Sequence, residues 1–254
     1  AVVNVNVMSK LEGLLAAAEE GQHPGLNYKL PIQARGISGR RQVQFYPSGN
    51  AFSSNGVRGL RFDVAGGDWI IPDTIALQCK FVNDDADKAL APISSDLHCL
   101  FEQLTISVSG QIVEQIGGGG CSFGRITEML NKALSSDKRI SDSQFGFGTT
   151  NAAATASGTS PPGVEIPANG SIRTVFRPAV SGLLSQKLAL PLWAMAPSMQ
   201  IEFLLVANAA DAVDAQFDGA IAASAATKSQ KWHLEECVLV ADVISLESMQ
   251  MNNW

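Results

Sequence analysis

Apolar and polar residues alternate with a period of two along much of the chain, which is the pattern of β-strands that bury one face. The alternation is strictest from Leu104 to Ser109, where Leu, Ile and Val share one face and Thr and Ser the other. The Ser109-Gly110 pair that closes this run predicts a tight turn or a bulge. Runs of this kind predict strands at residues 42–46, 57–64, 74–82, 104–116, 172–176, 188–193, 199–206 and 232–246.

The first 25 residues have a different period, which is typical of a short amphipathic helix. Ser9 and Glu12 have the spacing of a capping box, and Gly21 is a suitable C-terminal stop. The apolar residues that share one face of this helix are Leu11, Leu14, Leu15 and Ala18. A helix of this kind ahead of a β domain has to dock on the same subunit, on a neighbour or on an inner membrane surface.

A second helical period follows the glycine run at residues 117–120, which predicts a hinge. Its apolar residues are Ile126, Met129, Leu130, Ala133 and Leu134. We expect Ile126, Met129, Leu130 and Leu134 to form the buried face of a helix that closes one end of a sandwich. An aspartate at Met129 or Leu130 would then abolish soluble folding, because a buried unpaired charge costs several kcal/mol.

Two segments lack the large apolar residues that a core requires. Residues 135–170 are rich in Ser, Thr, Ala, Gly and Pro, and residues 207–226 are rich in Ala. Both therefore predict long surface excursions. The predicted fold is an all-β, two-sheet sandwich of about eight to nine strands with two short helices. Residues 1–40 form an N-terminal arm with the first helix, and residues 41–254 form one sandwich domain.

The composition indicates a surface with little charge. Charged residues make up 17% of the chain and hydrophobic residues 46%, whereas soluble globular proteins average about 25% charged residues. Neutral surface tends to become interface, which favours an assembly subunit, although an ordinary secreted or cytosolic domain fits the composition equally well. The net charge of −6 excludes an overall basic field that would attract nucleic acid. A local basic cluster, which either touches phosphates or decorates a solvated arm, consists of Lys29, Arg35, Arg40 and Arg41.

The four cysteines, Cys79, Cys99, Cys121 and Cys237, are widely spaced and form no C-x-x-C pair. Cys79 and Cys237 lie inside apolar, strand-like runs, where a cysteine behaves as a small core residue. We therefore expect free thiols and a reducing compartment. No apolar run reaches the roughly 18–20 residues that span a bilayer, and the N-terminus lacks a signal-peptide pattern.

Catalytic patterns are missing from the sequence. The three histidines, His23, His98 and His233, are accompanied by no nucleophile elbow and no metalloprotease motif. His98 and Cys99 could supply two metal ligands, but adjacent residues of a strand point to opposite faces. The glycine run at residues 117–120 precedes a helix but lacks the Lys and Ser/Thr of a phosphate-binding loop. We expect no catalytic residue, no metal site and no cofactor.

Two further residue groups have structural interpretations that compete with binding. Asp84, Asp85 and Asp87 could hold Ca²⁺, yet no glycine and distal glutamate complete a calcium loop, which favours a solvated acidic turn. The four tryptophans could stack on a sugar, but Trp193 and Trp232 lie in or beside strand runs, which favours core or interface packing. The four are Trp69, Trp193, Trp232 and Trp254.

The segment from Asp96 to Leu104 is more specific than a general β pattern. It reads Asp-Leu-His-Cys-Leu-Phe-Glu-Gln-Leu and leads through a strand at residues 105–108 and the Ser109-Gly110 turn to a helix at residues 125–134. This order resembles the first jelly roll of the double-jelly-roll major capsid proteins of tailless phages, large eukaryotic DNA viruses, polinton-like elements and the adenovirus hexon lineage. In that family, a Leu-His-Ser-Leu-Phe type of entry leads into a strand, an Asn-Gly turn and a helix that ends in a Leu-Leu pair.

The resemblance covers residues 55–135 well and residues 170–247 loosely. Its flanks include a strand that ends at residues 61–64, a Pro-Asp-Thr entry at residues 72–74 and a late strand pair within residues 232–246. The departure is length, because family members carry two jelly rolls and this chain has strands for about one. The chain is therefore either a single-jelly-roll subunit or the first half of a longer or processed polypeptide.

The resemblance implies a structural capsid protein that self-assembles into a viral shell, with copies of itself and other capsid proteins as partners. Its location would be the virion, after assembly in the host cell. The N-terminal arm would contact an inner membrane or the genome, although Glu19 and Glu20 argue against a direct genome clamp. We expect residues 1–40 and 135–170 to contact neighbouring subunits more than their own sandwich. The alternatives are a non-catalytic β-sandwich binding module, such as a lectin or adhesin, and an enzyme with an unrecognised site.

Overall fold

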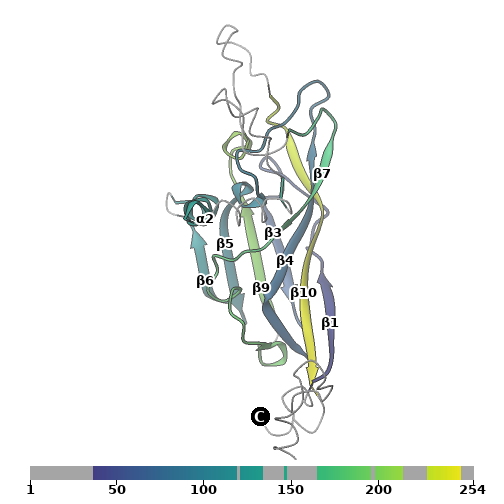
Figure 1. The fold of residues 1–254 in the computed structure, drawn as a ribbon, viewed down its shortest axis with the longest axis vertical. Helices are drawn as coiled ribbons and strands as arrows, with labels where there is room; N and C mark the ends of the chain where they lie inside the picture. The colour runs from purple at the N-terminus through teal and green to yellow at the C-terminus, as the bar shows by residue number, and fades with distance from the viewer. Residues whose placement is uncertain are drawn as a thin grey trace, which may run out of the picture. The chain divides into compact units, whose positions relative to one another are not determined.

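Two antiparallel sheets form the two layers of a sandwich in the computed structural model, which describes residues 37–118, 121–133, 146–147, 165–195, 198–213 and 228–246 (Figure 1). The main path of sheet A contains, in spatial order, β1 (Ile37–Phe45), β10 (Trp232–Leu246), β4 (Trp69–Asn83) and β7 (Ser171–Phe176). Two-residue strands extend it, β2 (Ala51–Phe52) on β10 and β8 (Leu190–Pro191) on β4. Sheet B contains, in order, β3 (Gly59–Val64), β9 (Met199–Leu205), β5 (Phe101–Val108) and β6 (Gln111–Gly117).

The strands pair in a nested order. The first long strand, β1, lies beside the last, β10, and within this pair β3 lies beside β9, β4 beside β7, and β5 beside β6. The chain therefore crosses repeatedly between the sheets, and each sheet contains strands from both halves of the sequence. Nested antiparallel pairing over two layers, with four strands in sheet B and four on the main path of sheet A, is the jelly roll, so the predicted fold class is confirmed.

The core lies between the two sheets and consists of the inward-facing residues of both. In β9, every second residue from Met199 to Leu205 is buried, as alternation requires. Phenylalanines from both sheets meet at the centre, where the ring of Phe101 lies 5.1 Å from Phe203 and 6.0 Å from Phe176. Phe123 packs edge-on to Phe176 at 6.0 Å. This aromatic cluster joins both sheets and the neighbouring helix in one core.

The predicted strand at residues 104–116 is a β-hairpin. Strand β5 ends at Val108, and β6 begins at Gln111. The two residues between them have positive φ angles, 52° at Ser109 and 79° at Gly110. Two left-handed residues are typical of the tight turn that matches the twist of a hairpin. The prediction of a turn at Ser109-Gly110 is confirmed.

Two strand predictions need correction. The run at residues 188–193 contains only the two residues of β8, followed by a 3-10 turn over Leu192–Met195. Pro191 cannot donate a backbone hydrogen bond, so it ends the ladder. The predicted late strand pair is instead one strand of 15 residues, β10, which is irregular between Glu235 and Val238 and between Val240 and Asp242.

The predicted second helix exists, but its predicted buried face is wrong. Helix α2 (Phe123–Lys132) buries Phe123, Gly124 and Thr127, whereas Met129 is 69% exposed and Leu130 is 52% exposed. A Cβ at Gly124 would lie 2.6 Å from the carbonyl oxygen of His98. The helix therefore packs along its glycine face, because only glycine permits this approach. Ile126 is half-buried.

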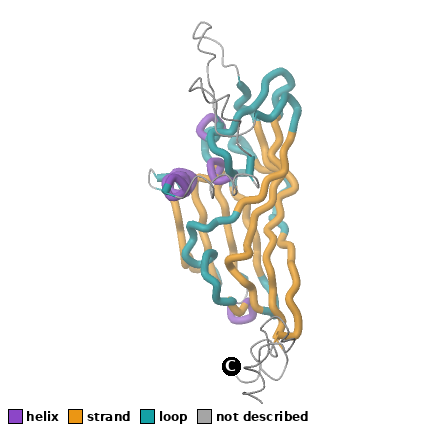
Figure 2. The backbone as a smooth tube through the Cα atoms, viewed as in Figure 1, coloured by secondary structure: helices purple, strands orange, loops and turns teal. Residues whose placement is uncertain are grey.

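Several predictions fall on residues outside the described part of the chain. These include the helix between Ser9 and Gly21, Leu134 of the second helix, and most of the excursions at residues 135–170 and 207–226. Within the first excursion, Phe147 is buried and its ring lies 5.1 Å from Phe81. Figure 2 shows strands as the main component and the helical turns at their ends. No helix within the described ranges is long and apolar enough to cross a membrane.

Candidate functional site

A cleft of about 710 Å³ lies where strands β5, β6 and β9 meet helix α2 and the 3-10 turn η3 (Leu97–Leu100). Val206 and Ala210 contribute apolar surface to its lining, and Glu102, Arg125 and Asp211 contribute charge. His98, Cys99 and Glu128 also line it. Three residues of the segment from Asp96 to Leu104, which carries the capsid resemblance, therefore line the cleft: His98, Cys99 and Glu102.

Side-chain caps fix the first residues of η3 and α2, the two elements that carry His98, Cys99 and Glu128. Asp96 begins η3, and its carboxylate accepts a hydrogen bond from the backbone N–H of Leu97 at 2.7 Å. Ser122 begins α2 in the same way, and its hydroxyl oxygen accepts from the N–H of Arg125 at 3.3 Å. Side-chain caps of this kind stabilise helix starts because the first N–H groups have no partner within the helix.

Gly117 makes the junction between β6 and α2. Its φ angle is 95°, and a Cβ there would lie 2.4 Å from the carbonyl oxygen of Glu102. Any other residue would therefore clash with β5 as well as strain the backbone. At Gly117, the predicted glycine hinge is therefore a tightly packed junction. Residues 119–120 of the glycine run lie outside the described ranges.

His98 connects η3 to α2 through carboxylates. Its Nε2 lies 2.9 Å from Oε2 of Glu128 and 3.3 Å from the hydroxyl of Ser94. The Ser94 hydroxyl donates to the same Glu128 oxygen at 3.0 Å. On the other side of the ring, Nδ1 lies 3.6 Å from Oδ2 of Asp96, which is an ion-pair distance. The histidine is 1% exposed.

The carboxylates decide the charge of this histidine. Burial by itself lowers the pKa of His98, but interactions with Asp96 and Glu128 outweigh burial and raise the pKa to about 9. At neutral pH the imidazole is therefore protonated. A buried cation held by two anions from different elements acts as a clamp between η3 and α2.

A serine, a histidine and carboxylates within hydrogen-bond reach of one another are also the groups that make up a nucleophilic active site. A histidine acts as a general base only when one ring nitrogen is unprotonated at the operating pH. The pKa of His98 is about 9, so its imidazole is protonated at neutral pH. Ser94 is 6% exposed and its hydroxyl points to Glu128, so it is no accessible nucleophile. Cys99 is no better, since burial raises the pKa of its thiol. The cluster therefore fits a structural role.

The sequence interpretation missed this cluster. It weighed His98 only together with Cys99, as a metal pair that it rejected, whereas the partners of His98 are Ser94, Asp96 and Glu128. Glu128 is brought to His98 by the packing of α2 on η3, and no spacing rule connects them. Among the described residues, no group of three or more His, Cys, Asp or Glu side chains is arranged to hold a metal.

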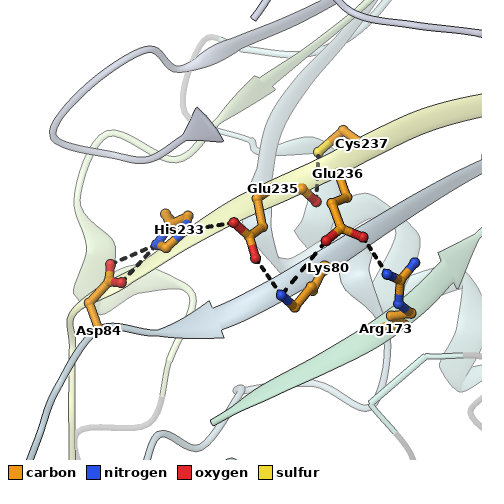
Figure 3. A network of polar contacts seen from close by, with 7 residues as sticks. All are labelled: Lys80, Asp84, Arg173, His233, Glu235, Glu236 and Cys237. Carbon is orange, nitrogen blue, oxygen red and sulfur yellow. Dashed lines mark hydrogen bonds and ion pairs between the residues drawn. The ribbon is translucent and has the colours of Figure 1, made fainter. Parts of the chain in front are cut away.

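A second polar cluster runs across β10, β4 and β7 (Figure 3). Nδ1 of His233 lies 2.8 Å from Asp84, Nζ of Lys80 lies 2.5 Å from Glu235 and 3.8 Å from Glu236, and Arg173 pairs with Glu236. The hydrogen bond between Lys80 and Glu235 lowers the pKa of Glu235 and raises the pKa of Lys80. These charges are paired with one another across three strands.

The acidic turn is held by its own hydrogen bonds. Oδ1 of Asp85 accepts from the backbone N–H groups of Asp87, at 3.0 Å, and Lys88, at 3.2 Å. The hydrogen bond from Asp87 lowers the pKa of Asp85. Asp84 is paired with His233. The arrangement is that of a turn in which the carboxylates bind their own backbone and a histidine.

The remaining predicted groups are separated in the structure. Arg40 pairs with Asp242 at 2.5 Å and Arg41 with Asp68 at 2.7 Å, so these two cations of the basic cluster are neutralised within the sandwich. Trp232 is a core residue, with its ring 5.5 Å from Phe81, whereas Trp193 is 50% exposed. Lys29, Arg35 and Trp254 lie outside the described residues.

Large apolar side chains are exposed at several places on the sandwich. Ile112 and Val113 are 62% and 57% exposed on the edge strand β6, and Met129 and Leu130 are exposed on α2. The other exposed large apolar residues are Tyr46, Val57, Ile93, Leu188 and Trp193. Apolar residues scattered singly are normal on a protein surface, whereas contiguous apolar patches are typical of surfaces that contact another protein.

The sequence matches no protein-family model and no curated protein. Its fold, however, matches solved viral structures. A chain of the PBCV-1 virus capsid is 13% identical with a TM-score of 0.56, and the match covers 89% of this chain and 46% of that one. A chain of the Sputnik virophage is 14% identical with a TM-score of 0.50, with 89% and 52% covered.

The Faustovirus major capsid protein is 8% identical with a TM-score of 0.51, and the match covers 92% of this chain and 58% of that one. The chain therefore spans about half the length of the capsid proteins it matches, which are double-jelly-roll proteins. The resemblance seen in the segment from Asp96 to Leu104 is confirmed as a common fold.

Proposed function

We propose that the chain is a structural, non-catalytic subunit that self-assembles into the shell of a virus. The observation that carries the proposal is the jelly-roll topology, which structures of the PBCV-1 capsid and the Faustovirus major capsid protein share over 89% and 92% of this chain. The partners would be further copies of the chain and other capsid proteins, and the location would be the virion.

The surface chemistry supports this role. The charges across β10, β4 and β7 are paired with one another, and charged residues make up only 17% of the chain. Interfaces that stay assembled bury apolar surface and are depleted of charge at their centres. Exposed Ile112, Val113, Met129 and Leu130 supply such apolar surface.

The N-terminal arm, residues 1–40, is the proposed link between subunits. Its predicted helix has an apolar face of Leu11, Leu14 and Leu15. An inner membrane or the genome are the alternative surfaces for this arm. Arg40 and Arg41 are already paired with carboxylates of the sandwich, which weakens the case for contact with phosphates.

The test is sedimentation of the full-length protein beside a variant that lacks residues 1–25. We expect the full-length protein to form closed oligomers or shells, with interfaces of well over about 2,000 Å² per contact pair. The shorter variant should keep its circular dichroism spectrum and melting temperature but assemble poorly. A full-length variant with Leu11, Leu14 and Leu15 replaced by Ser is the matched control, because it keeps the length of the arm. A full-length protein that stays monomeric at high concentration would contradict the proposal and favour the binding module.

A further inference from the structure

Cys79 of β4 and Cys237 of β10 occupy facing positions on neighbouring strands. In the register of this strand pair, Gln78 lies opposite Val238 and Lys80 opposite Glu235. Glu236 and Cys237 therefore both lie opposite Cys79, which is a β-bulge. The side chains of Cys79 and Cys237 are 3% and 4% exposed, so both belong to the core.

The bulge keeps the two cysteines on the same face of the sheet. Glu236 has a φ angle of 51°, and its exposed side chain pairs with Arg173 and Lys80 on the outer face (Figure 3). Because Glu236 is the extra residue, Cys237 returns to the inner face beside Cys79. The thiol of Cys237 donates to the carbonyl oxygen of Glu235 at 3.8 Å. The outer ion pairs thus hold the bulge whose inner side carries the thiol.

Residues that face each other on neighbouring antiparallel strands lie within the range that a disulfide requires. Facing residues of an antiparallel pair have Cα atoms about 4.5–5.5 Å apart, and disulfides need about 4.4–6.8 Å. The two thiols also interact with each other. Burial raises the pKa of Cys79 most, and the interaction with Cys237 raises it further. Both thiols are free in the structure. We propose that Cys79 and Cys237 form a cross-strand disulfide when the protein meets a low-molecular-weight disulfide such as oxidised glutathione.

The reaction balances as two exchange steps. The thiolate of Cys237 attacks one sulfur of the oxidant, forms a mixed disulfide and releases one small thiolate. The thiolate of Cys79 then attacks Sγ of Cys237 and releases the second small thiolate. One protein disulfide forms, the oxidant is reduced to two thiols, and these take up the two protons that the cysteines lose. Burial of both thiols makes the steps slow, because they require transient opening of the bulge.

The disulfide would connect residues that are far apart in the sequence through the two longest strands of sheet A. A subunit could therefore fold with free thiols in a reducing cell and become cross-linked after exposure to oxidising surroundings. The chemistry of the site does not depend on the proposed shell function, so each proposal has its own test. Assembly is measured by sedimentation, and the cross-link by mass spectrometry.

The experiment uses the full chain with Cys99→Ala and Cys121→Ser, which leaves only Cys79 and Cys237. After incubation with oxidised glutathione, we expect loss of both free thiols, a mass decrease of two hydrogen atoms and one peptide that joins the two cysteines. The melting temperature should rise by roughly 10 °C, because the bond closes a very long loop. Dithiothreitol should reverse the rise.

The matched controls are the same background with Cys79→Ala or Cys237→Ala, in which no such peptide or rise should appear. If either control fails to fold, thiol counting in the unmodified full chain replaces it, since Cys79 and Cys237 should be lost together. The proposal is overturned if both thiols stay free after an exposure that fully oxidises Cys121 in the unmodified chain. A stable mixed disulfide at either cysteine without a cross-link would overturn it equally.

Discussion

At the scale of single residues, His98 carries a positive charge in a place that water hardly reaches. Removing a charge from water is costly unless partners compensate for it. Asp96 and Glu128 provide that compensation from η3 and α2. The charge of one imidazole therefore contributes to the attachment of the helix, and its loss should weaken that attachment.

The pH dependence of stability follows from this charge. The pKa of His98 is raised to about 9 in the folded protein, and it is about 6.5 in an unfolded chain. A raised pKa stabilises the fold fully below about pH 6.5, and the contribution is lost as the pH rises to about 9. In the native protein, the free energy of unfolding should fall over this range by an amount on the order of 3 kcal/mol.

The check is urea unfolding of the native protein and of His98→Gln at several pH values. Glutamine has a similar length and cannot titrate, so the variant should lose this part of the slope. An unchanged slope in His98→Gln would mean that other groups cause the pH dependence.

Glu236 gives a second residue-scale prediction. Its φ angle of 51° is left-handed, which costs a residue with a Cβ roughly 1–2 kcal/mol. Glu236→Ala and Glu236→Gly both lose the ion pairs to Arg173 and Lys80, but only glycine relieves the strain. We expect the glycine variant to be more stable than the alanine variant by about 1 kcal/mol in urea unfolding. The reverse order would show that the backbone at the bulge is unstrained.

Residue-scale chemistry was the least predictable part of the protein. The sequence predicted that Cys79 and Cys237 are core residues, and burial confirms it. It could not predict that a bulge at Glu236 makes the two cysteines face each other, since a single extra residue changes the register. Glu128 was equally hidden, because tertiary packing alone brings it to His98.

At the scale of elements, helix α2 shows where amphipathic counting fails. The count of apolar residues selected Met129 and Leu130, but the core takes Phe123 and Thr127. Gly124 allows α2 to approach η3 so closely that the glycine side of the helix becomes the buried one. Strand prediction was more successful because alternation with a period of two directly reports which face is buried.

The corrected helix orientation changes the expected effect of mutation. Met129→Asp and Leu130→Asp should each change the free energy of unfolding by less than about 1 kcal/mol, because both side chains are exposed in the structure. Phe123→Ala, on the opposite side, should lower it by about 3–5 kcal/mol. Thermal unfolding of the three variants checks this. Loss of soluble protein in the two aspartate variants would restore the sequence-based expectation.

The junction between β6 and α2 depends on Gly117. Gly117→Ala combines a positive φ angle with a clash against the carbonyl oxygen of Glu102, whereas a Cβ at Gly110 would meet no atom within 4 Å. We expect Gly110→Ala to cost roughly 1–2 kcal/mol from backbone strain alone, and Gly117→Ala clearly more. Equal costs in chemical denaturation would show that the junction can relax.

At the scale of the whole molecule, sheet A depends on its last strand. Strand β10 lies between β1 and β4 and also pairs with β2. A chain without residues 228–254 should therefore not form a native sandwich. Circular dichroism and limited proteolysis should show an unfolded or aggregated product, whereas the variant without residues 1–25 should resist proteolysis. A stably folded product without β10 would mean that sheet A closes in another way.

The nested pairing has a consequence for biosynthesis. Strand β1 can pair only after β10 has been synthesised, since the contacts that complete sheet A join distant parts of the chain. Many contacts between distant residues, or a high contact order, slow folding. While the ribosome is still making the later strands, β1 and β4 have no partner between them and expose edges that attract other chains. The sandwich therefore closes only after β10 has left the ribosome. Its yield in a cell should depend on chaperones that shield these edges during synthesis.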